Sequence, residues 1–188
     1  MAIRAVVLVE GISDRLAVMT LAERLGRNLD AEGISVIAIG GAHALGNALR
    51  EVDSGVQVAG LCDAGEEDAF RRALETSGVG TAVDRARLEA LGFYVCEADL
   101  EDELVRALGC ARVAEIIDAQ GETRRFRTFQ KQPEKRALPL GGQLHGFMWN
   151  RKIRYAPLLV EALDLDHVPR PLGGVLAHVS RETSPQRR

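Results

Sequence analysis

Short runs of Val, Ile, Leu and Ala alternate with amphipathic stretches through the first half of the chain. The runs at residues 4–9, 34–41, 56–65 and 93–96 predict buried strands. Apolar positions at helical spacing predict helices from about Ser13, as N-cap, to Gly26, over 42–52 and over 66–77, and another that begins near Asp99. Apolar strands between helices indicate a mostly parallel sheet that is covered on both faces.

The pattern changes after residue 110. Helical segments predicted at 112–119, 123–130, 143–147, 152–163 and 169–179 are separated by turns that contain Gly or Pro. We expect an α/β domain at 1–110, a basic helical extension packed on it at 111–180, and a frayed polar tail at 181–188. The expected fold class is α/β, with a four-stranded, mostly parallel sheet flanked by helices and a C-terminal helical extension.

Charge is unevenly distributed. Residues 1–120 hold 11 Lys+Arg and 21 Asp+Glu, a balance of −10, and residues 121–188 hold 13 and 6, a balance of +7, in agreement with the total of −3. This split fits a cation site beside a phosphate-binding surface. Two halves that neutralise each other across an interface would explain it equally well.

Composition also narrows the class of protein. No apolar run reaches the ~18–20 residues of a membrane span, and Glu10 and Asp14 interrupt the first run, unlike a signal peptide. Cys62 and Cys96 lie in apolar runs and Cys110 has no partner at a familiar spacing, which indicates free thiols in a reducing compartment. We expect a cytoplasmic protein without membrane contact. No CxxC or HxxxH spacing supports a zinc site.

Acidic residues stand where the predicted strands end: Glu10 and Asp14 after the first, Asp63 after the third, and Glu97 and Asp99 after the fourth. Parallel strands share one C-terminal edge, so we expect these carboxylates to converge. Such clusters suit Mg²⁺ or Mn²⁺, and two ions can activate a water against a phosphodiester. The alternative is that each acid only complements a helix dipole.

Other phosphate chemistry has less support. The glycines of "IGGAHALGNAL" form no GxGxxG array, and no GK[ST] follows them. Backbone N–H groups at the start of the helix that follows remain candidates to bind a phosphate group. No GxSxG supports a serine nucleophile.

Three segments, "VLVEGISDRLAV", "VIAIGGAHAL" and "VAGLCDAGEE", resemble in this order the TOPRIM domain. With "EADLEDEL", the chain is most similar to the nuclease branch named for overcoming lysogenisation defect, OLD, over residues 4–110 and more loosely to about Leu163. The resemblance implies a Rossmann-like TOPRIM fold and a stand-alone protein that nicks or cuts DNA by hydrolysing phosphodiesters with one or two Mg²⁺ or Mn²⁺ ions.

The resemblance also implies roles for residues. Glu10 would be a metal ligand or general base, and Lys152 would stabilise charge on the scissile phosphate, with Lys131 as the second choice. The position two after Asp63, where the family has a second acid, is Gly65, and Glu66 or Glu67 would substitute for it. The full implied metal set is Glu10, Asp14, Asp63, Glu66, Asp99 and Glu101. Asp102 and Glu103 are expected to face solvent or cap the helix.

Basic residues crowd "TRRFRTFQKQPEKR" and the later "NRKIRYAP". They would neutralise DNA phosphates. Phe126 and Phe129, three positions apart, favour packing into the core over stacking on bases. The predicted nucleic-acid-binding set is Arg124, Arg125, Arg127, Lys131, Lys135, Arg136, Arg151 and Arg154.

Partners and alternatives follow from the same resemblance. OLD proteins usually join the TOPRIM part to an ATPase, and this sequence has no Walker A motif, so an ATPase would be a separate chain or ATP would not be used. Homodimerisation stays open. Gly65 favours a non-catalytic nucleic-acid-binding or scaffold TOPRIM protein with a degraded metal site. A small-molecule phosphatase, the third reading, predicts a closed pocket.

Overall fold

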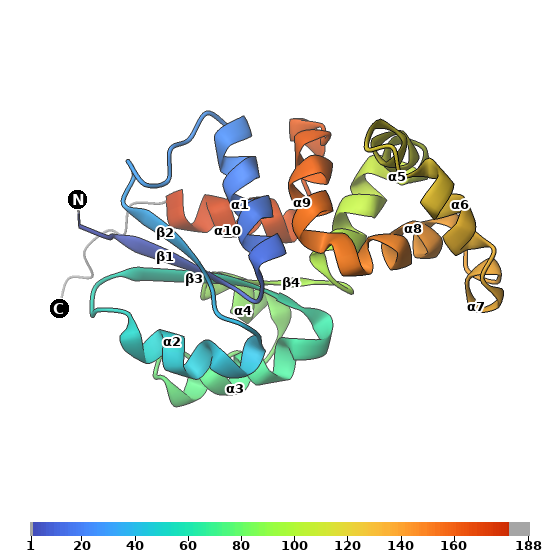
Figure 1. Ribbon diagram of the computed structural model, residues 1–188. Helices are drawn as coiled ribbons and strands as arrows, with labels where there is room; N and C mark the ends of the chain where they lie inside the picture. Colours follow the sequence, from blue (N-terminus) through green and yellow to red (C-terminus); the bar gives the residue numbers. More distant parts are fainter. Residues whose placement is uncertain (1, 181–188) are drawn as a thin grey trace.

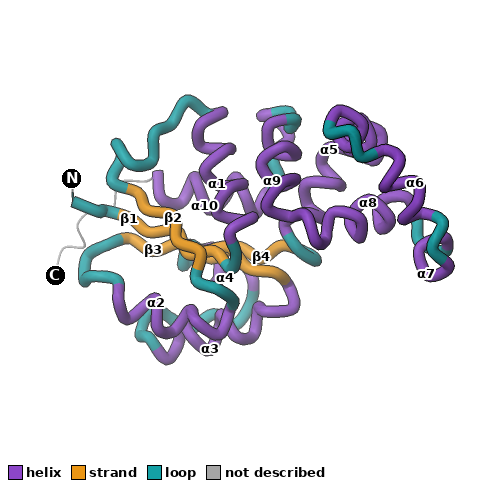
Figure 2. The backbone as a smooth tube through the Cα atoms, in the orientation of Figure 1, coloured by secondary structure: helices purple, strands orange, loops and turns teal. Residues whose placement is uncertain are grey.

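A four-stranded sheet forms the centre of the protein, which a computed structural model describes over residues 2–180. Its strands are β1 (Ala5–Val9), β2 (Ile34–Ala38), β3 (Gln57–Asp63) and β4 (Phe93–Cys96), all parallel, in the order β2-β1-β3-β4. Figures 1 and 2 show the strands running side by side between two layers of helices. The predicted α/β class is confirmed. The tail expected at 181–188 lies outside the described residues.

Helices cover both faces of the sheet, which explains the lack of polar positions in the strands. On one face lie α1 (Ile12–Arg24) and α10 (Arg170–Ser180), and on the other α2 (Leu45–Glu51), α3 (Glu67–Thr76) and α4 (Arg85–Ala90) (Figure 1). Side chains alternate along β1, so Val7 and Val9 join the core under α1, whereas Val6 and Leu8 join the core above α2 and α3. Cys62 and Cys96 are buried free thiols, as predicted.

A helical extension leaves the sheet after β4. It comprises α5 (Leu100–Ala119), α6 (Thr123–Gln130), α7 (Pro133–Arg136), α8 (Leu140–Met148) and α9 (Lys152–Glu161). Figure 1 shows α9 returning beside α1, while α6 and α7 project away from the sheet. Because α9 packs against both α1 and α5, its first residue, Lys152, lies near the start of both helices. None of the described helices combines the length and hydrophobicity needed to cross a membrane.

Local structure differs from the sequence prediction at three places. Helix α1 begins at Ile12 with Gly11, not Ser13, as N-cap, because the Asp14 carboxylate accepts the Gly11 N–H at 2.8 Å. Residues 85–90, which lie outside the predicted helices and strands, make α4, whose N-cap Asp84 accepts the Arg87 N–H at 2.8 Å. The segment 112–119 continues α5 across a kink at Gly109, where φ is 76°.

Candidate functional site

Carboxylates from three elements converge at the C-terminal edge of the sheet. Glu10 follows β1, and its Oε1 accepts the backbone N–H of Asp63 at the end of β3, 2.9 Å away. Burial, and then the charges of Glu10, Asp14 and Asp99, raise the pKa of Asp63 from 3.8 to about 8. Glu10, Asp14 and Asp99 therefore lie close enough to Asp63 for their charges to oppose its ionisation.

Asp14 and Glu10 respond to the same crowding. Burial and the charge of Glu101 raise the pKa of Asp14 to about 6. Burial raises the pKa of Glu10, and the charge of Glu66 adds to the effect. Asp14 also binds the first turn of α1 through the Gly11 amide, so the helix-capping reading holds for one of its oxygens. The charges of Glu101 and Glu10 oppose the ionisation of Asp14, and helix capping does not explain this crowding.

Lys152 carries a positive charge into this acidic edge. Its Nζ lies 2.9 Å from Asp99 Oδ2 and 2.7 Å from Glu101 Oε2. Burial would lower the pKa of Lys152, but its contacts with Glu101 and Asp99 raise it well above the usual range. Lys152 is thus held as an ammonium ion by two carboxylates and is not a solvated lysine on a helix face.

Asp99 is the N-cap of α5, where its Oδ1 accepts the Asp102 N–H at 2.9 Å. Its two oxygens also lie 2.9 and 2.8 Å from His145 Nε2. Burial would raise the pKa of Asp99, but the contacts with His145 and Lys152 hold it well below its usual range. Through the hydrogen bond to Asp99, the pKa of His145 is in turn raised. Asp99 is therefore an ionised centre to which helices α5, α8 and α9 all contribute.

Glu101 is the most deeply buried acid of the site, with 1% of its surface exposed. Within the described residues its Oε1 accepts no hydrogen bond. Its Oε2 forms an ion pair with Lys152, but the direction of approach is not that of a hydrogen bond. A buried carboxylate with an unused oxygen is costly unless a cation binds it. Glu101 Oε1 is therefore available as a ligand for a cation.

The turn after β3 replaces the missing second acid only in part. Gly65 lies exposed in a 3-10 turn (Ala64–Glu66), and a Cβ there would meet no atom within 4 Å. Glu67 is taken by Arg71 and by Arg85, whose Nε lies 2.8 Å away. Glu66 is the neighbour whose charge acts on Glu10. Of the two candidates, Glu66 is the one that faces the acidic edge.

Two acids depart from the expectation for this edge. Glu97 does not converge with the others: its side chain is 71% exposed and lies 3.3 Å from Arg106. Glu103 does not face solvent but is buried, because its Oε1 accepts the Glu97 N–H at 2.8 Å and also pairs with Arg106. That contact with the turn before α5 resembles a cap. Asp102, as expected, remains partly exposed and pairs with Arg106.

The donors suit a hard divalent cation by their chemistry, since they are carboxylate oxygens and one of them is buried and unused. In the described part of the chain, however, no three His, Cys, Asp or Glu residues are already spaced to hold a metal ion. The residues that would hold an ion are Glu10, Asp14 and Asp63, with Glu66 beside Glu10 and Glu101 beside Asp14, together with Asp99. Binding would require some of these side chains to rotate.

In the glycine turn after β2, the backbone amides of Gly40 and Gly41 are used within the fold and are not available to bind a phosphate. The N–H groups of Gly40 and Gly41 donate to the Glu10 carbonyl oxygen at 3.0 and 3.1 Å. Both glycines have positive φ, 80° and 110°, which turns their amides toward the end of β1. This turn therefore positions Glu10.

Two residues of the site, His145 and Trp149, are not among those predicted from the sequence. The Trp149 ring lies edge-on to His145, with centroids 6.1 Å apart, and Lys152 Nζ is 4.5 Å from its centroid. The spacing His145, Trp149, Lys152 is i, i+4, i+7, typical of one helical face. That spacing was the available signal.

A second charged cluster lies on the helical extension around buried Glu122. Tyr155 Oη donates to Glu122 at 2.7 Å and Arg125 Nη1 donates at 2.9 Å, while one nitrogen each of Arg151 and Arg154 lies 3.7 Å away. The hydrogen bond from Tyr155 and these arginines lower the pKa of Glu122. One carboxylate thus holds three guanidinium groups and leaves an excess of positive charge.

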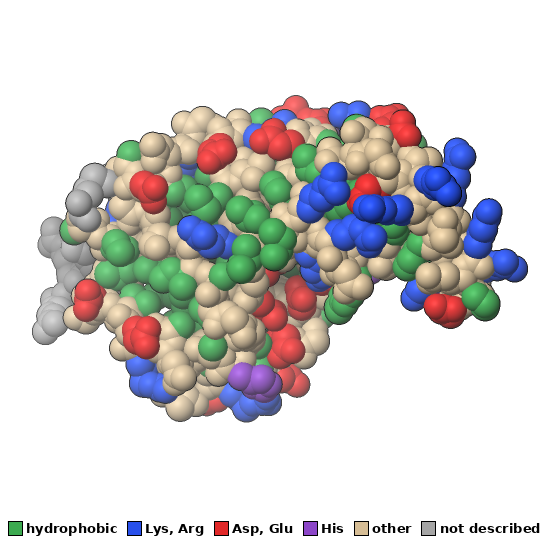
Figure 3. Space-filling view, in the orientation of Figure 1, with side chains coloured by type: hydrophobic (Ala, Val, Ile, Leu, Met, Phe, Trp, Pro, Cys, Tyr) green, Lys and Arg blue, Asp and Glu red, His purple; other side chains and the backbone are tan. Residues whose placement is uncertain are grey.

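Other basic residues of the predicted set surround this cluster. A surface hollow beside it is lined in part by Arg124, Arg125, Arg151, Phe129 and Phe147. Further out on α6 and α7 lie Arg127, Lys131, Lys135 and Arg136. Figure 3 shows the basic side chains gathered over the helical extension, and acidic ones between it and the lower helices.

The phenylalanines of α6 pack inward, as predicted. Phe126 is buried, with its ring centroid 5.2 Å from that of Phe147. Phe129 is partly buried, 5.7 Å from Phe147. These rings hold α6 against α8 and so fix the arginine surface.

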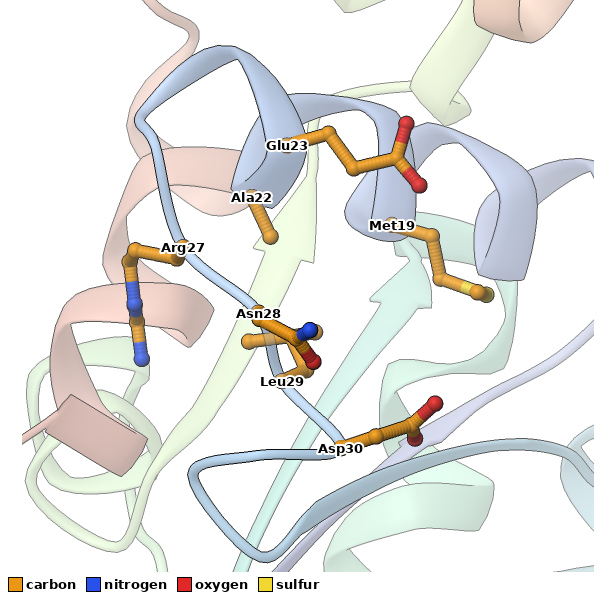
Figure 4. A pocket seen from close by; sticks show the side chains of 7 residues that line it. All are labelled: Met19, Ala22, Glu23, Arg27, Asn28, Leu29 and Asp30. Carbon is orange, nitrogen blue, oxygen red and sulfur yellow. The ribbon is translucent and has the colours of Figure 1, made fainter.

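A separate hollow lies at the far end of α1 (Figure 4). It is lined by Met19, Ala22, Glu23, Arg27, Asn28, Leu29 and Asp30. Helix α1 is 13 residues long, so this end lies about 20 Å from the acidic edge. Arg27 there is paired with Glu32 at 2.6 Å. The hollow is not part of the candidate site.

Comparison with known proteins agrees with this architecture. Residues 3–64 match the family model described as "Overcoming lysogenization defect protein-like, TOPRIM domain", a range that includes Glu10, Asp14 and Asp63. The search of curated proteins finds no match.

Solved structures extend the likeness to nearly the whole chain. The C-terminal region of the Xanthomonas campestris pv. campestris OLD protein superposes with a TM-score of 0.71 at 23% identity, covering 94% of this chain and 91% of that one. The C-terminal region of the Burkholderia pseudomallei OLD protein gives 0.71 at 21% identity, covering 96% and 98%. Residues 3–64 therefore resemble an OLD-like TOPRIM domain, and the chain as a whole has the fold of the C-terminal regions of OLD proteins.

Proposed function

We propose that this protein hydrolyses DNA phosphodiesters with Mg²⁺ or Mn²⁺, as a nicking enzyme or endonuclease. The observation that carries the proposal is the contact of Lys152 with Asp99 and Glu101 at the acidic edge, where the charges of neighbouring acids also raise the pKa of Asp63. Crowded carboxylates provide ligands for divalent cations, and an ammonium beside them suits an anionic substrate that such ions share. The OLD-like TOPRIM module supports a nuclease-type reaction.

The residues divide into three roles. Glu10, Asp14 and Asp63 would hold the cation, with Glu66, Asp99 and Glu101 completing its ligands or those of a second ion. A bound divalent cation supplies an activated water and a Lewis acid. Lys152 would stabilise the negative charge that develops on the scissile phosphate, and Asp99 and Glu101 hold its ammonium for that purpose.

DNA is the proposed partner because the basic surface adjoins the acidic edge. Arg151 and Arg154 lie on the same segment as Lys152, and Arg124 and Arg125 lie across the hollow from them. A guanidinium group can donate two parallel hydrogen bonds to the oxygens of one phosphate. Contacts of this kind make the affinity for DNA depend on salt concentration. An open basic surface of this kind suits a polymeric backbone better than the closed pocket of a small-molecule phosphatase.

Nicking of a supercoiled plasmid tests the proposal. Wild type would be incubated with Mg²⁺, Mn²⁺ or EDTA, beside Glu10→Gln. The matched control is Glu97→Gln, an exposed acid that follows β4 on the same edge but stands outside the cluster. We expect metal-dependent nicking by wild type and Glu97→Gln, and at least a 100-fold loss in Glu10→Gln (about 2.7 kcal/mol of transition-state stabilisation). Plasmid that stays intact with every metal, or equal nicking by Glu10→Gln, would overturn it.

Gly65 favours a second candidate, a nucleic-acid-binding TOPRIM protein with a degraded metal site. In that case the arginine surface would act alone. Wild type would then shift plasmid in a gel without nicking it, and Glu10→Gln would bind equally well. The plasmid assay therefore distinguishes the two functions when binding and cleavage are read from the same reactions.

A further inference from the structure

Trp149 is an aromatic side chain without a structural role in the core. It lies in the 3-10 turn Trp149–Arg151 between α8 and α9, with 58% of its surface exposed, and the nearby Ile153 is 57% exposed. It is the one tryptophan of the sequence. Large aromatic rings contribute most when buried, so an exposed ring beside a functional site suggests contact with a ligand.

The ring lies within reach of the proposed reaction centre. Lys152 Nζ, 4.5 Å from the Trp149 centroid, is the same atom that contacts Asp99 and Glu101 at 2.9 and 2.7 Å. The imidazole of His145, at an interplanar angle of 72°, packs edge-on against Trp149. A ligand that reaches the Lys152 ammonium therefore meets the tryptophan ring next.

The charge around the ring indicates what that ligand is. Arg151 and Arg154 share its segment and, with Arg125, surround the single buried carboxylate of Glu122. An exposed aromatic ring with an excess of guanidinium groups is complementary to a nucleotide strand, whose bases stack and whose phosphates pair with arginine. An apolar protein surface would leave the excess positive charge of these guanidinium groups without a counter-charge.

We propose that Trp149 stacks on an unpaired nucleobase next to the scissile phosphate, so that the preferred substrate is single-stranded or locally unpaired DNA. The proposal rests on the proposed function. In an intact duplex both faces of a base are covered by its neighbours, whereas an unpaired base offers a face to the ring. The arginines around Glu122 would hold the phosphates of the same strand.

Intrinsic fluorescence tests the stacking directly, because Trp149 is the one tryptophan of the sequence and its emission reports contact with a base. Wild type in EDTA, where no cleavage takes place, would be titrated with a single strand, with a blunt duplex, and with the same duplex carrying a short bulge. We expect quenching by the single strand and the bulged duplex, and several-fold less by the blunt duplex. Equal quenching by all three would overturn the proposal, as would emission that changes with protein concentration alone, the result expected if a second copy covers the ring.

Affinity of the variants provides the second measurement. By anisotropy of a labelled single strand, Trp149→Ala should bind about 5- to 150-fold more weakly, and Trp149→Phe should recover part of the loss. Val83→Ala, which shortens another exposed apolar side chain, serves as control. Single-strand binding by Trp149→Ala equal to that of wild type would overturn the proposal. Failure of plasmid nicking with quenching intact would remove the nuclease function and leave the stacking site.

Discussion

Replacing Asp63 by Asn should stabilise the metal-free fold, because Asp63 lies among other acids. Burial first, and the charges of Glu10 and Asp14 next, raise its pKa from 3.8 to about 8. Between these two values the folded protein holds a proton that the unfolded chain releases, so the free energy of unfolding falls as pH rises from about 4 to about 8. Above that range the full destabilisation is present.

The structure limits the size of the destabilisation that ionised Asp63 causes. A shift of this extent corresponds to about 6 kcal/mol if taken whole. Asp63 is partly exposed, and its neighbours can relax, so solvent screening reduces the effect; we expect about 1–3 kcal/mol at pH 9. At pH 5 the folded protein already carries the proton, and the gain from Asp63→Asn should be much smaller.

Urea unfolding, monitored by circular dichroism in EDTA, measures the free energy of unfolding of Asp63→Asn and of wild type at pH 5 and at pH 9. Asp53→Asn, at an exposed loop position, is the matched control and should change neither value by more than a few tenths of a kcal/mol. Our reasoning fails if Asp63→Asn is less stable than wild type at pH 9, or if it gains equally at both pH values.

Three other substitutions address the site and its support. Gly65→Asp adds the missing acid at a position where a Cβ would meet no atom within 4 Å and φ is not positive, so the fold should persist. Mn²⁺-dependent nicking of plasmid should then rise several-fold. An unchanged nicking rate would mean that Glu66 already fills the role of this acid. Lys152→Met leaves two buried carboxylates without their cation and should lower the free energy of unfolding in EDTA by about 1–3 kcal/mol while abolishing nicking. Tyr155→Phe removes a buried hydroxyl that donates at 2.7 Å and should cost about 1–2 kcal/mol in urea while nicking is kept; equal stability would contradict the role given to that contact.

The fold could be predicted largely because the strands are buried on both faces. Strands β1 and β3 contain continuous apolar runs, without the alternation of polar and apolar residues that a half-exposed strand shows. Helix ends were less predictable, since they depend on which side chain caps which amide: Asp14 binds Gly11 and so starts α1 one residue before Ser13. Helix α4 is short, and Leu88 is the one fully buried side chain within it, which gives little periodic signal.

The site was predictable to the extent that strand ends define it. Glu10 and Asp63 follow from topology alone, because parallel strands end at one edge. Glu97 and Glu103 could not be placed that way, since their directions depend on the turn between β4 and α5, where the Glu97 amide donates to Glu103. The spacing of His145, Trp149 and Lys152 places His145 on the helical face of Lys152, but its contact with Asp99 depends on the packing of α8 on α5, a tertiary contact that no local pattern specifies.

The central claim, that these acids form a divalent-cation site, is tested most directly by Mn²⁺ binding. An electron paramagnetic resonance titration at pH 8.5 would count the ions bound by wild type, Glu10→Gln, Asp63→Asn and the control Glu97→Gln. We predict one or two bound ions for wild type and for Glu97→Gln, and at least a tenfold weaker affinity in the other two variants (about 1.4 kcal/mol). Absence of binding by wild type, or equal affinity in all four proteins, would contradict the claim.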